Sequence, residues 1–401
     1  MLYRKIGKTG CEASVLSLGC MRLPMLEQKN PPKDFMERQR AVDEEKALEL
    51  IDYAINNGIN YLDSAYMYHA GNSELILGKA IKGKRDNLII TTKSPVMMIQ
   101  KNEDFDRILD EQLEKLGTDH LDFYLLHGLN KTTWEKAKEL NALEFLDKVQ
   151  NDGRVKYAGF SFHDKTDVFK DIIDSYNWAA CQIQYNYFDE NYQAGKEGLK
   201  YAASKDIGVI IMEPLRGGRL AQRIPEGVQK IWDSAEEKHS PVEWSLRWVA
   251  NHPEVSVILS GMSTLDQLKE NLSIADKFTP GNLTQKDLEV IGKAADAYRD
   301  LMKVDCTGCN YCMPCPNGVN IPMVFSAYND QAMFNDEMSA MMYNSMIGPE
   351  QNAANCIECG ECEEKCPQNI EIIENLKIAH EALFDEAIKP RPGGPPPKPE
   401  D

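Results

Sequence analysis

The sequence is poor in basic residues, and its first 300 residues contain little cysteine. Lys and Arg number 45 against 63 Asp and Glu, which gives a formal charge of -18. An acidic surface repels phosphate backbones, so we expect no nucleic-acid partner. Only three of the 11 cysteines precede residue 300, namely Cys11, Cys20 and Cys181. The composition is otherwise that of a globular protein, with 42% apolar and 27% charged residues.

Long apolar runs are also missing. The first thirty residues lack the continuous apolar core of a secretory signal, and no later stretch reaches membrane-spanning length. These absences predict a soluble, cytoplasmic protein without a membrane partner. A disulfide framework is not expected there, because it needs an oxidising compartment, and clustered thiols more often hold metal.

From Ser14 to about Ala275, short apolar runs alternate with stretches in which apolar residues recur every three or four positions. The runs predict eight strands, at Val15–Leu18, Ile59–Asp63, Leu88–Lys93, Leu121–His127, Tyr157–Ser161, Ala180–Gln184, Val209–Met212 and Val255–Leu259. The stretches between them predict helices such as Glu44–Asn57, Phe105–Leu116, Ala142–Asp152, Gly195–Lys205 and Val242–Asn251. An open doubly wound sheet usually carries a Gly-rich phosphate turn after its first strand, and no G-x-G-x-x-G occurs there. The fold class predicted is α/β, a (β/α)8 TIM barrel.

The barrel is the first of three predicted parts. Leu2–Ile6 and Cys11–Ser14 flank a Gly-Lys-Thr-Gly turn, which predicts an N-terminal β-hairpin covering the barrel floor. We expect residues 1–300 to form the barrel domain and residues 301–388 a mainly helical module. Residues 389–401 hold six prolines and predict a disordered tail.

Four side chains stand where strands end and loops begin, the place at which barrel enzymes keep their working residues. Asp63 ends the second strand, Tyr68 lies five residues later, Lys93 ends the third strand and His127 the fourth. Taken singly, each could be a loop cap, a packed ring, a solvated strand end or a core histidine. Together they suit carbonyl reduction, in which negative charge develops on the carbonyl oxygen and needs a proton donor and oriented hydrogen bonds. A tyrosine can be that donor if a lysine lowers its pKa.

These residues lie in motifs that resemble the aldo-keto reductases. The motifs are Tyr3–Gly10, Asp63–Tyr68, Leu125–His127 and, after Gly261, the run Asp266–Asn271. The resemblance covers residues 1 to about 280. It implies a catalytic tetrad of Asp63, Tyr68, Lys93 and His127 with Tyr68 as general acid/base. It also implies NADPH or NADH bound across the barrel mouth, and a small carbonyl or alcohol substrate.

The same resemblance implies contacts to the nicotinamide and adenine ends of the dinucleotide. Ser161 and Gln182 would hold the nicotinamide carboxamide. Met212 stands where the family has a tyrosine that stacks on the nicotinamide ring. Asn271 would contact the adenine.

The phosphates of the dinucleotide have fewer matching residues. The loop that contains Leu215 and Arg216 would lie near the pyrophosphate. Ser260 and Gln267 occupy the positions of the Lys and Arg that bind the 2′-phosphate in the family. A phosphate dianion without a bidentate cation is poorly discriminated, so the preference between NADPH and NADH stays open.

The other eight cysteines form two runs. Cys306, Cys309, Cys312 and Cys315 have the pattern C-x2-C-x2-C-x2-C-P, and Cys356, Cys359, Cys362 and Cys366 have C-x2-C-x2-C-x3-C-P. The second run matches the bacterial ferredoxin pattern for [4Fe–4S] ligation, and the first lacks one residue before its last cysteine. Zinc held by two pairs of C-x2-C knuckles is the alternative. The repeated triple spacing followed by Cys-Pro favours two [4Fe–4S] clusters in a ferredoxin-like module.

In two-cluster ferredoxins the fourth cysteine of each run ligates the other cluster. By this resemblance, one cluster would take Cys306, Cys309, Cys312 and Cys366. The other would take Cys356, Cys359, Cys362 and Cys315.

Two classes of function are therefore compatible with the sequence. In the first, an aldo-keto reductase carries clusters that exchange electrons with ferredoxin or another redox partner, or that only shape the structure. In the second, an electron-transfer protein uses the barrel to dock its partner. Hydride carries two electrons and each cluster normally moves one, and no flavin site that would bridge the difference is recognisable.

Overall fold

The computed structural model describes residues 1–27, 39–335 and 337–385. These separate into two compact units. The first contains the N-terminal residues, Gln39–Ala221 and Glu237–Ile291, and the second contains Gln222–Glu236 and the residues from Gly292 onward. The domain limits predicted at residues 300 and 388 stay predictions, and the predicted tail lies outside the described residues. Within the described ranges, no helix has both the length and the apolar character needed to span a membrane.

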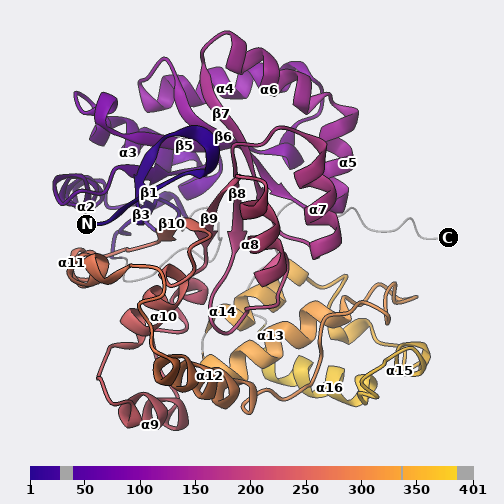
Figure 1. The fold of residues 1–401 in the computed structure, drawn as a ribbon. Coiled ribbons are helices and arrows are strands. Elements are labelled where there is room, and N and C mark those ends of the chain that lie inside the picture. The colour runs from indigo at the N-terminus through magenta and orange to yellow at the C-terminus, as the bar shows by residue number, and fades with distance from the viewer. Residues whose placement is uncertain (28–38, 336, 386–401) are drawn as a thin grey trace. The chain divides into compact units, whose positions relative to one another are not determined.

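The first unit is built around a closed barrel of eight parallel strands (Figure 1). Its strands are β3 Leu16–Gly19, β4 Tyr61–Asp63, β5 Ile89–Ser94, β6 Leu121–Leu129, β7 Val155–Phe162, β8 Ala180–Gln184, β9 Gly208–Met212 and β10 Val255–Ser260. Each strand pairs with the next along the chain, and β10 closes the ring between β9 and β3. The predicted (β/α)8 barrel is confirmed, and each strand lies within about two residues of its predicted limits.

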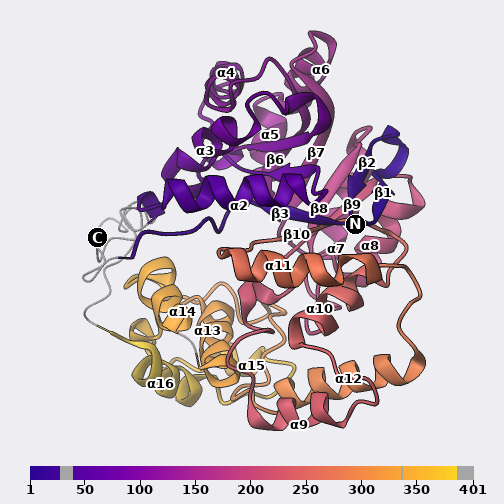
Figure 2. The same cartoon turned by 90° about the vertical axis from the view of Figure 1, so that its left-hand side faces the viewer.

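Helices of this unit surround the strands (Figure 2). They are α2 Glu44–Asn56, α3 Asn72–Ile81, α4 Glu103–Leu116, α5 Lys131–Glu139, α6 Ala142–Asn151, α7 Thr166–Ser175, α8 Gly195–Ser204, α10 Pro241–Ala250 and α11 Leu265–Ile274. Local signals set their ends. Ser240 caps α10 by accepting a hydrogen bond from the Glu243 amide at 3.1 Å, and Gly117 ends α4 in a left-handed conformation.

The predicted N-terminal hairpin is also present. Strands β1 Tyr3–Lys5 and β2 Glu12–Ser14 pair antiparallel. The turn between them lies against the backbone that leads into β9, where the Lys8 amide donates to the Asp206 carbonyl at 2.9 Å. Gly7 has a φ of +47°, and a Cβ there would collide with that backbone. The hairpin therefore covers the end at which the strands begin, opposite the end that carries the candidate catalytic residues.

The second unit is mainly helical. It contains α9 Glu226–Ser234, α13 Ile321–Phe334, α14 Glu337–Met341, a π-helix at Met342–Ile347, α15 Glu361–Glu364 and α16 Ile372–Leu383. The helix α12 Gln285–Arg299 runs across the limit of the two units in sequence. Apolar side chains of α13 and α16, such as Phe325 and Leu376, form a small core, and six of the eight clustered cysteines pack against it.

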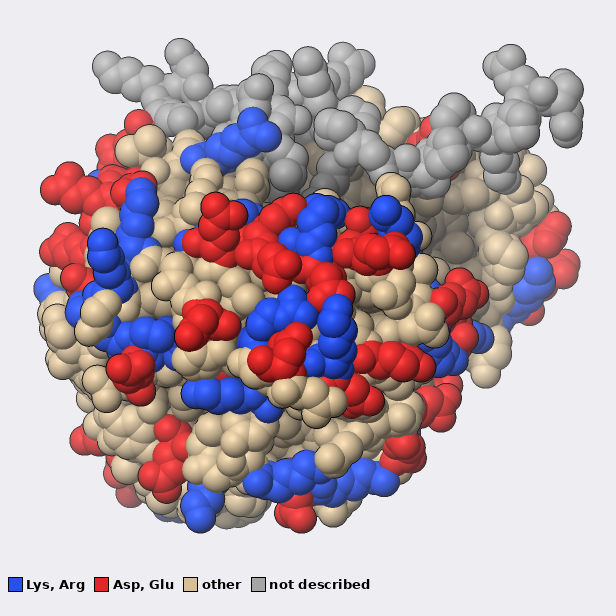
Figure 3. Space-filling model, turned by 90° about the horizontal axis from the view of Figure 1, so that it is seen from above, with Lys and Arg blue, Asp and Glu red and all other residues tan. Residues whose placement is uncertain are grey.

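Charges of both signs are interspersed on the face shown in Figure 3. Many charged side chains of the barrel unit form ion pairs. Arg154 forms ion pairs with Asp106, Asp110 and Asp152 at 2.7–2.9 Å. Such exposed pairs contribute little stability each, on the order of 0–1 kcal/mol, and they neutralise the surface locally.

Candidate active site and cluster sites

Lys93 is the centre of a buried polar cluster where β4 and β5 end. Its Nζ donates to Asp63 Oδ1 at 2.5 Å and to the Ser64 carbonyl at 2.7 Å, and it lies 3.5 Å from Tyr68 Oη. Lys93 is fully buried and Asp63 is 2% exposed. Two charges can remain buried from solvent only when each is paired and hydrogen-bonded. The structure thus brings three of the four predicted catalytic residues into one hydrogen-bonded group.

Tyr68 is held by an unusual loop. The two residues after it, His69 and Ala70, both have left-handed backbone angles, with φ of 52° and 55°. The buried His69 ring accepts a hydrogen bond from the Leu23 amide at 3.0 Å. This contact ties the loop that carries Tyr68 to the loop that follows β3, so the phenol has a defined position beside Lys93.

The fourth residue, His127, touches the tyrosine but not the ion pair. Its ring meets that of Tyr68 edge-on, with centroids 5.9 Å apart. β6 continues to Leu129, two residues beyond the predicted end, because Leu129 pairs with Phe162 of β7. Next to His127, the Gly128 amide donates to Ser161 Oγ of β7 at 2.8 Å. His127 is thereby held at the strand end facing the phenol.

Burial governs the proton affinities of these groups. It raises the pKa of Tyr68 above its ordinary value, and the positive charge of Lys93 opposes that rise. Burial lowers the pKa of Lys93, but the Asp63 carboxylate and Tyr68 together more than offset this, so the ammonium is retained. Burial, together with Lys93 and His163, lowers the pKa of His127 to about 3. His127 is therefore neutral at physiological pH and can donate an N–H hydrogen bond without being a cation.

Gln182, one of the residues predicted to bind the dinucleotide, is hydrogen-bonded to the catalytic group. Its side-chain amide donates to Asp63 Oδ2 at 3.1 Å. Asn271 donates to Ser260 Oγ at 2.9 Å, so these two buried side chains are paired with each other. Gln267 Oε1 accepts from the Ser263 amide at 2.9 Å.

The remaining predicted contacts lie at the end of β9 and in the loop that follows it. Met212 ends β9, and Leu215 accepts a hydrogen bond from the Gly218 amide at 2.9 Å, which shapes the loop. Arg216 is engaged within the protein: its Nε is 3.5 Å from Asp189 Oδ2 and its guanidinium stacks over Phe188.

A buried network behind β5 was not predicted. Gln112 of α4 donates to the Lys93 carbonyl at 3.1 Å and to the buried Glu74 of α3 at 2.6 Å. Thr92 donates to the same Glu74 oxygen at 2.6 Å. The signal available in the sequence was Gln112 itself, a polar residue on the face of α4 that otherwise carries Ile108 and Leu109.

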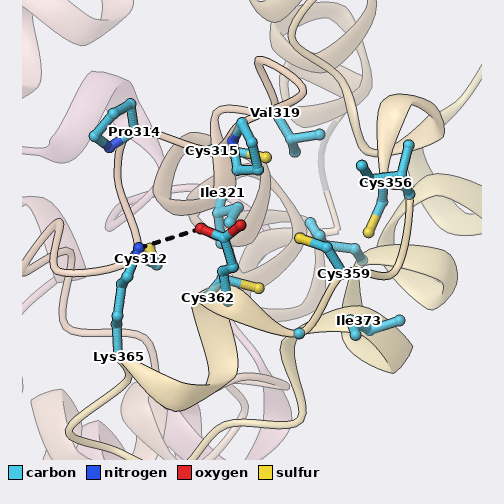
Figure 4. Close-up of a pocket in the computed structure, with 15 residues that line it drawn as sticks. Cys312, Pro314, Cys315, Val319, Ile321, Cys356, Cys359, Cys362, Lys365 and Ile373 are labelled. Carbon is cyan, nitrogen blue, oxygen red and sulfur yellow. Dashed lines mark hydrogen bonds and ion pairs between the residues drawn. The ribbon is translucent and has the colours of Figure 1, made fainter.

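The eight cysteines gather around two hollows in the second unit. One hollow, of about 390 Å³, is lined by Cys315, Cys356, Cys359 and Cys362. Figure 4 shows their sulfurs around a shared space. The other, of about 330 Å³, is lined by Cys306, Cys309 and Cys366. Cys312 lines both. The fourth cysteine of each run thus lies with the first three cysteines of the other run.

At least four cysteines line each hollow, which is the number of thiolates that holds a [4Fe–4S] cluster. Within the described ranges, no three His, Cys, Asp or Glu side chains converge closely enough to hold one metal ion. Burial raises the pKa of Cys306, Cys312 and Cys362, that of Cys362 to about 11. The thiolate forms accordingly need a positive partner, which a metal centre supplies.

Residues 32–295 match the aldo/keto reductase family. The chain belongs to this family. Residues 305–371 match the 4Fe-4S dicluster domain. This aldo/keto reductase is therefore an oxidoreductase that combines a barrel with an iron–sulfur domain, as the motifs predicted.

One known protein similar to this aldo/keto reductase is the uncharacterized oxidoreductase YqkF of Bacillus subtilis (strain 168). It is 25% identical over 320 residues, which cover 73% of this chain and 95% of the relative. The NADH-specific methylglyoxal reductase of Escherichia coli (strain K12) is 23% identical over 304 residues, covering 64% and 89% of the two chains. Among solved structures, the holo form of aldo-keto reductase AKR11C1 from Bacillus halodurans is 25% identical with a TM-score of 0.61, over 73% of this chain and 96% of that one.

Proposed function

We propose that this enzyme reduces an aldehyde or ketone to an alcohol with hydride from NADPH or NADH, and that Tyr68 is the general acid/base. The observation that supports this is the buried lysine. Lys93 Nζ contacts both the Asp63 carboxylate and the Tyr68 hydroxyl. A fixed cation beside a phenol stabilises the phenolate that forms when the proton leaves.

The proposed reaction balances with one hydride and one proton. A dinucleotide bound at the barrel mouth would supply the hydride to the carbonyl carbon. Tyr68 Oη donates its proton to the carbonyl oxygen, and Lys93 stabilises the resulting phenolate until solvent returns a proton. The neutral His127 donates an N–H hydrogen bond to the same oxygen. In the reverse direction the phenolate accepts the proton of the alcohol.

The dinucleotide contacts belong to the same proposal. Ser161 and Gln182 would hold the carboxamide, and Met212 would pack on the nicotinamide ring. Asn271 would contact the adenine beside Ser260, and Leu215 lies in the loop proposed for the pyrophosphate. Arg216 would lie in the same loop near the pyrophosphate, and Ser260 and Gln267 would lie at the 2′-phosphate positions.

The proposal is tested by carbonyl-dependent oxidation of the dinucleotide. Protein purified without oxygen is mixed with NADPH or NADH and a panel of aldehydes and ketones, and the loss of reduced dinucleotide is followed by absorbance. Methylglyoxal is included because a relative bears its name. We expect consumption only after a carbonyl is added. Failure with every carbonyl and both dinucleotides would contradict the proposal.

The pH dependence should follow Tyr68 and not His127. Because the pKa of His127 lies near 3 and that of Tyr68 is raised, neither changes its charge between about pH 5 and pH 8. We expect kcat/KM for reduction to be flat over this range and to fall only at alkaline pH. Lys93→Met removes the positive charge that opposes the rise in the Tyr68 pKa. The fall of kcat/KM at alkaline pH should therefore move to higher pH. A midpoint near pH 6.5 would show that His127 titrates, contrary to this assignment.

The second unit supports an electron-transfer role beside the reductase. We propose two [4Fe–4S] clusters, the first held by Cys306, Cys309, Cys312 and Cys366 and the second by Cys315, Cys356, Cys359 and Cys362. Cys359 is exposed, and its neighbour Ile357 is 61% exposed. The second cluster would therefore lie close enough to the surface to exchange single electrons with ferredoxin or another redox partner.

The number of electrons that hydride and the clusters carry determines whether the dinucleotide alone should reduce the clusters. Hydride delivers two electrons to one atom, whereas each cluster takes one. We expect NADPH or NADH without a carbonyl to leave the clusters oxidised, and dithionite to reduce them, as followed by visible absorbance and EPR. Reduction by the dinucleotide would mean that the barrel and the clusters share electrons.

A further inference from the structure

Arg22 reaches across three strand ends of the barrel. It follows β3, and β10 lies between β3 and β9 in the barrel. Its aliphatic stem passes Gly261, just after β10, where an added Cβ would lie 3.2 Å from Cδ. Its guanidinium ends at Gly217, in the loop after β9, where an added Cβ would lie 2.9 Å from Nη2. One side chain thus connects the two loops proposed to face the phosphates.

The two glycines make room for this arrangement. A side chain at either position would crowd the arginine, and Gly217 also has a φ of +69°, which disfavours other residues. The glycine positions and Arg22 are therefore one structural feature, although more than 190 positions separate Arg22 from Gly217 in the sequence.

The guanidinium of Arg22 can bind a ligand, whereas that of Arg216 is already paired within the protein. Arg22 is exposed and makes no hydrogen bond or ion pair with any other residue in the described part of the chain. Arg216 already pairs with Asp189. Glu213 lies beside the same place: its Oε2 is 3.5 Å from where a Cβ of residue 217 would lie.

We propose that Arg22 binds the pyrophosphate of the dinucleotide, an inference that rests on the proposed function. It would supply a cation at the loop after β9, where Arg216 is already paired with Asp189. A guanidinium is suited to this because it can donate two parallel hydrogen bonds to a phosphate. The pyrophosphate, and not the 2′-phosphate, is the ligand because the guanidinium ends at the loop after β9. Only its apolar stem passes the end of β10. Glu213 opposes the binding by repelling the same phosphates.

The test measures the binding of NADH and NADPH to the cluster-containing protein without any carbonyl, by calorimetry or quenching of protein fluorescence. Arg22→Gln should raise the Kd of both dinucleotides by a similar factor, on the order of 10- to 100-fold, and reduce the dependence of Kd on salt. Glu213→Gln should lower both Kd values. Arg107→Gln, which removes an exposed arginine of α4 paired with Asp104 and Glu111, is the matched control and should leave both unchanged.

Each alternative outcome is distinct. Unchanged Kd values in Arg22→Gln, with normal binding to the wild-type protein, would overturn the inference and leave the proposed function standing. Loss of NADPH binding alone would assign Arg22 to the 2′-phosphate and overturn the pyrophosphate assignment. Absence of binding to the wild-type protein would contradict the proposed function itself. Arg22 is exposed, so folding should be unaffected, and the circular dichroism of each variant checks this.

Discussion

Tyr68→Phe should lower kcat for carbonyl reduction by about 10²- to 10⁴-fold, the usual contribution of a positioned general acid. The variant loses the hydroxyl that lies 3.5 Å from Lys93 Nζ, and the ring keeps its edge-on contact with His127. Binding of the dinucleotide should be unchanged, because the hydroxyl is proposed to act on the substrate oxygen. Steady-state turnover and a separate binding titration measure the two quantities.

Tyr66→Phe is the matched control for this experiment. Tyr66 lies in the same loop, but its hydroxyl donates to Glu111 of α4 at 2.8 Å. We expect turnover close to that of the wild-type protein. Equal losses in the two variants would mean that loop stability, and not proton donation, explains the effect. Full activity in Tyr68→Phe would rule out Tyr68 as the acid.

Cys359→Ser should leave about half of the iron and acid-labile sulfide of the wild-type protein. Cys359 lines only the hollow that it shares with Cys315, Cys356 and Cys362, and a serine hydroxyl is a poor ligand for iron. The second unit should also unfold at a lower temperature, because ligation of a metal centre contributes directly to the stability of a small module. Metal analysis, EPR of the reduced protein and thermal unfolding measure these effects.

Cys11→Ser controls for the loss of a thiol as such. Cys11 is a partly buried cysteine of the barrel unit, far in sequence from both runs. Its replacement should leave iron content unchanged. If Cys359→Ser retained two complete clusters, the proposed ligand set of the second hollow would be wrong.

The barrel was predictable because its strands are short apolar runs and its helices have an apolar face, both of which are local patterns. The predicted limits of β8 agree with the structure at both ends. β6 and β7 are longer than predicted because backbone pairing between them extends to Leu129 and Phe162. That pairing depends on a neighbouring strand and leaves no mark in the local sequence.

The candidate site divides in the same way. The predicted strand ends gave the positions of Asp63, Lys93 and His127. The cysteine spacing predicted which thiols would lie around the same hollow. The assignment of these residues to catalysis and ligation stays a prediction.

The family, the barrel, the iron–sulfur domain and the residue types at the strand ends could all be predicted from motifs and spacing along the chain. Three other features became visible only in the folded protein. Gln182 hydrogen-bonds to Asp63, burial keeps His127 neutral, and Arg22 lies beside Gly217 and Gly261. These are contacts between residues far apart in the chain. Barrel closure brings them together, and their energies depend on the burial and charge that result.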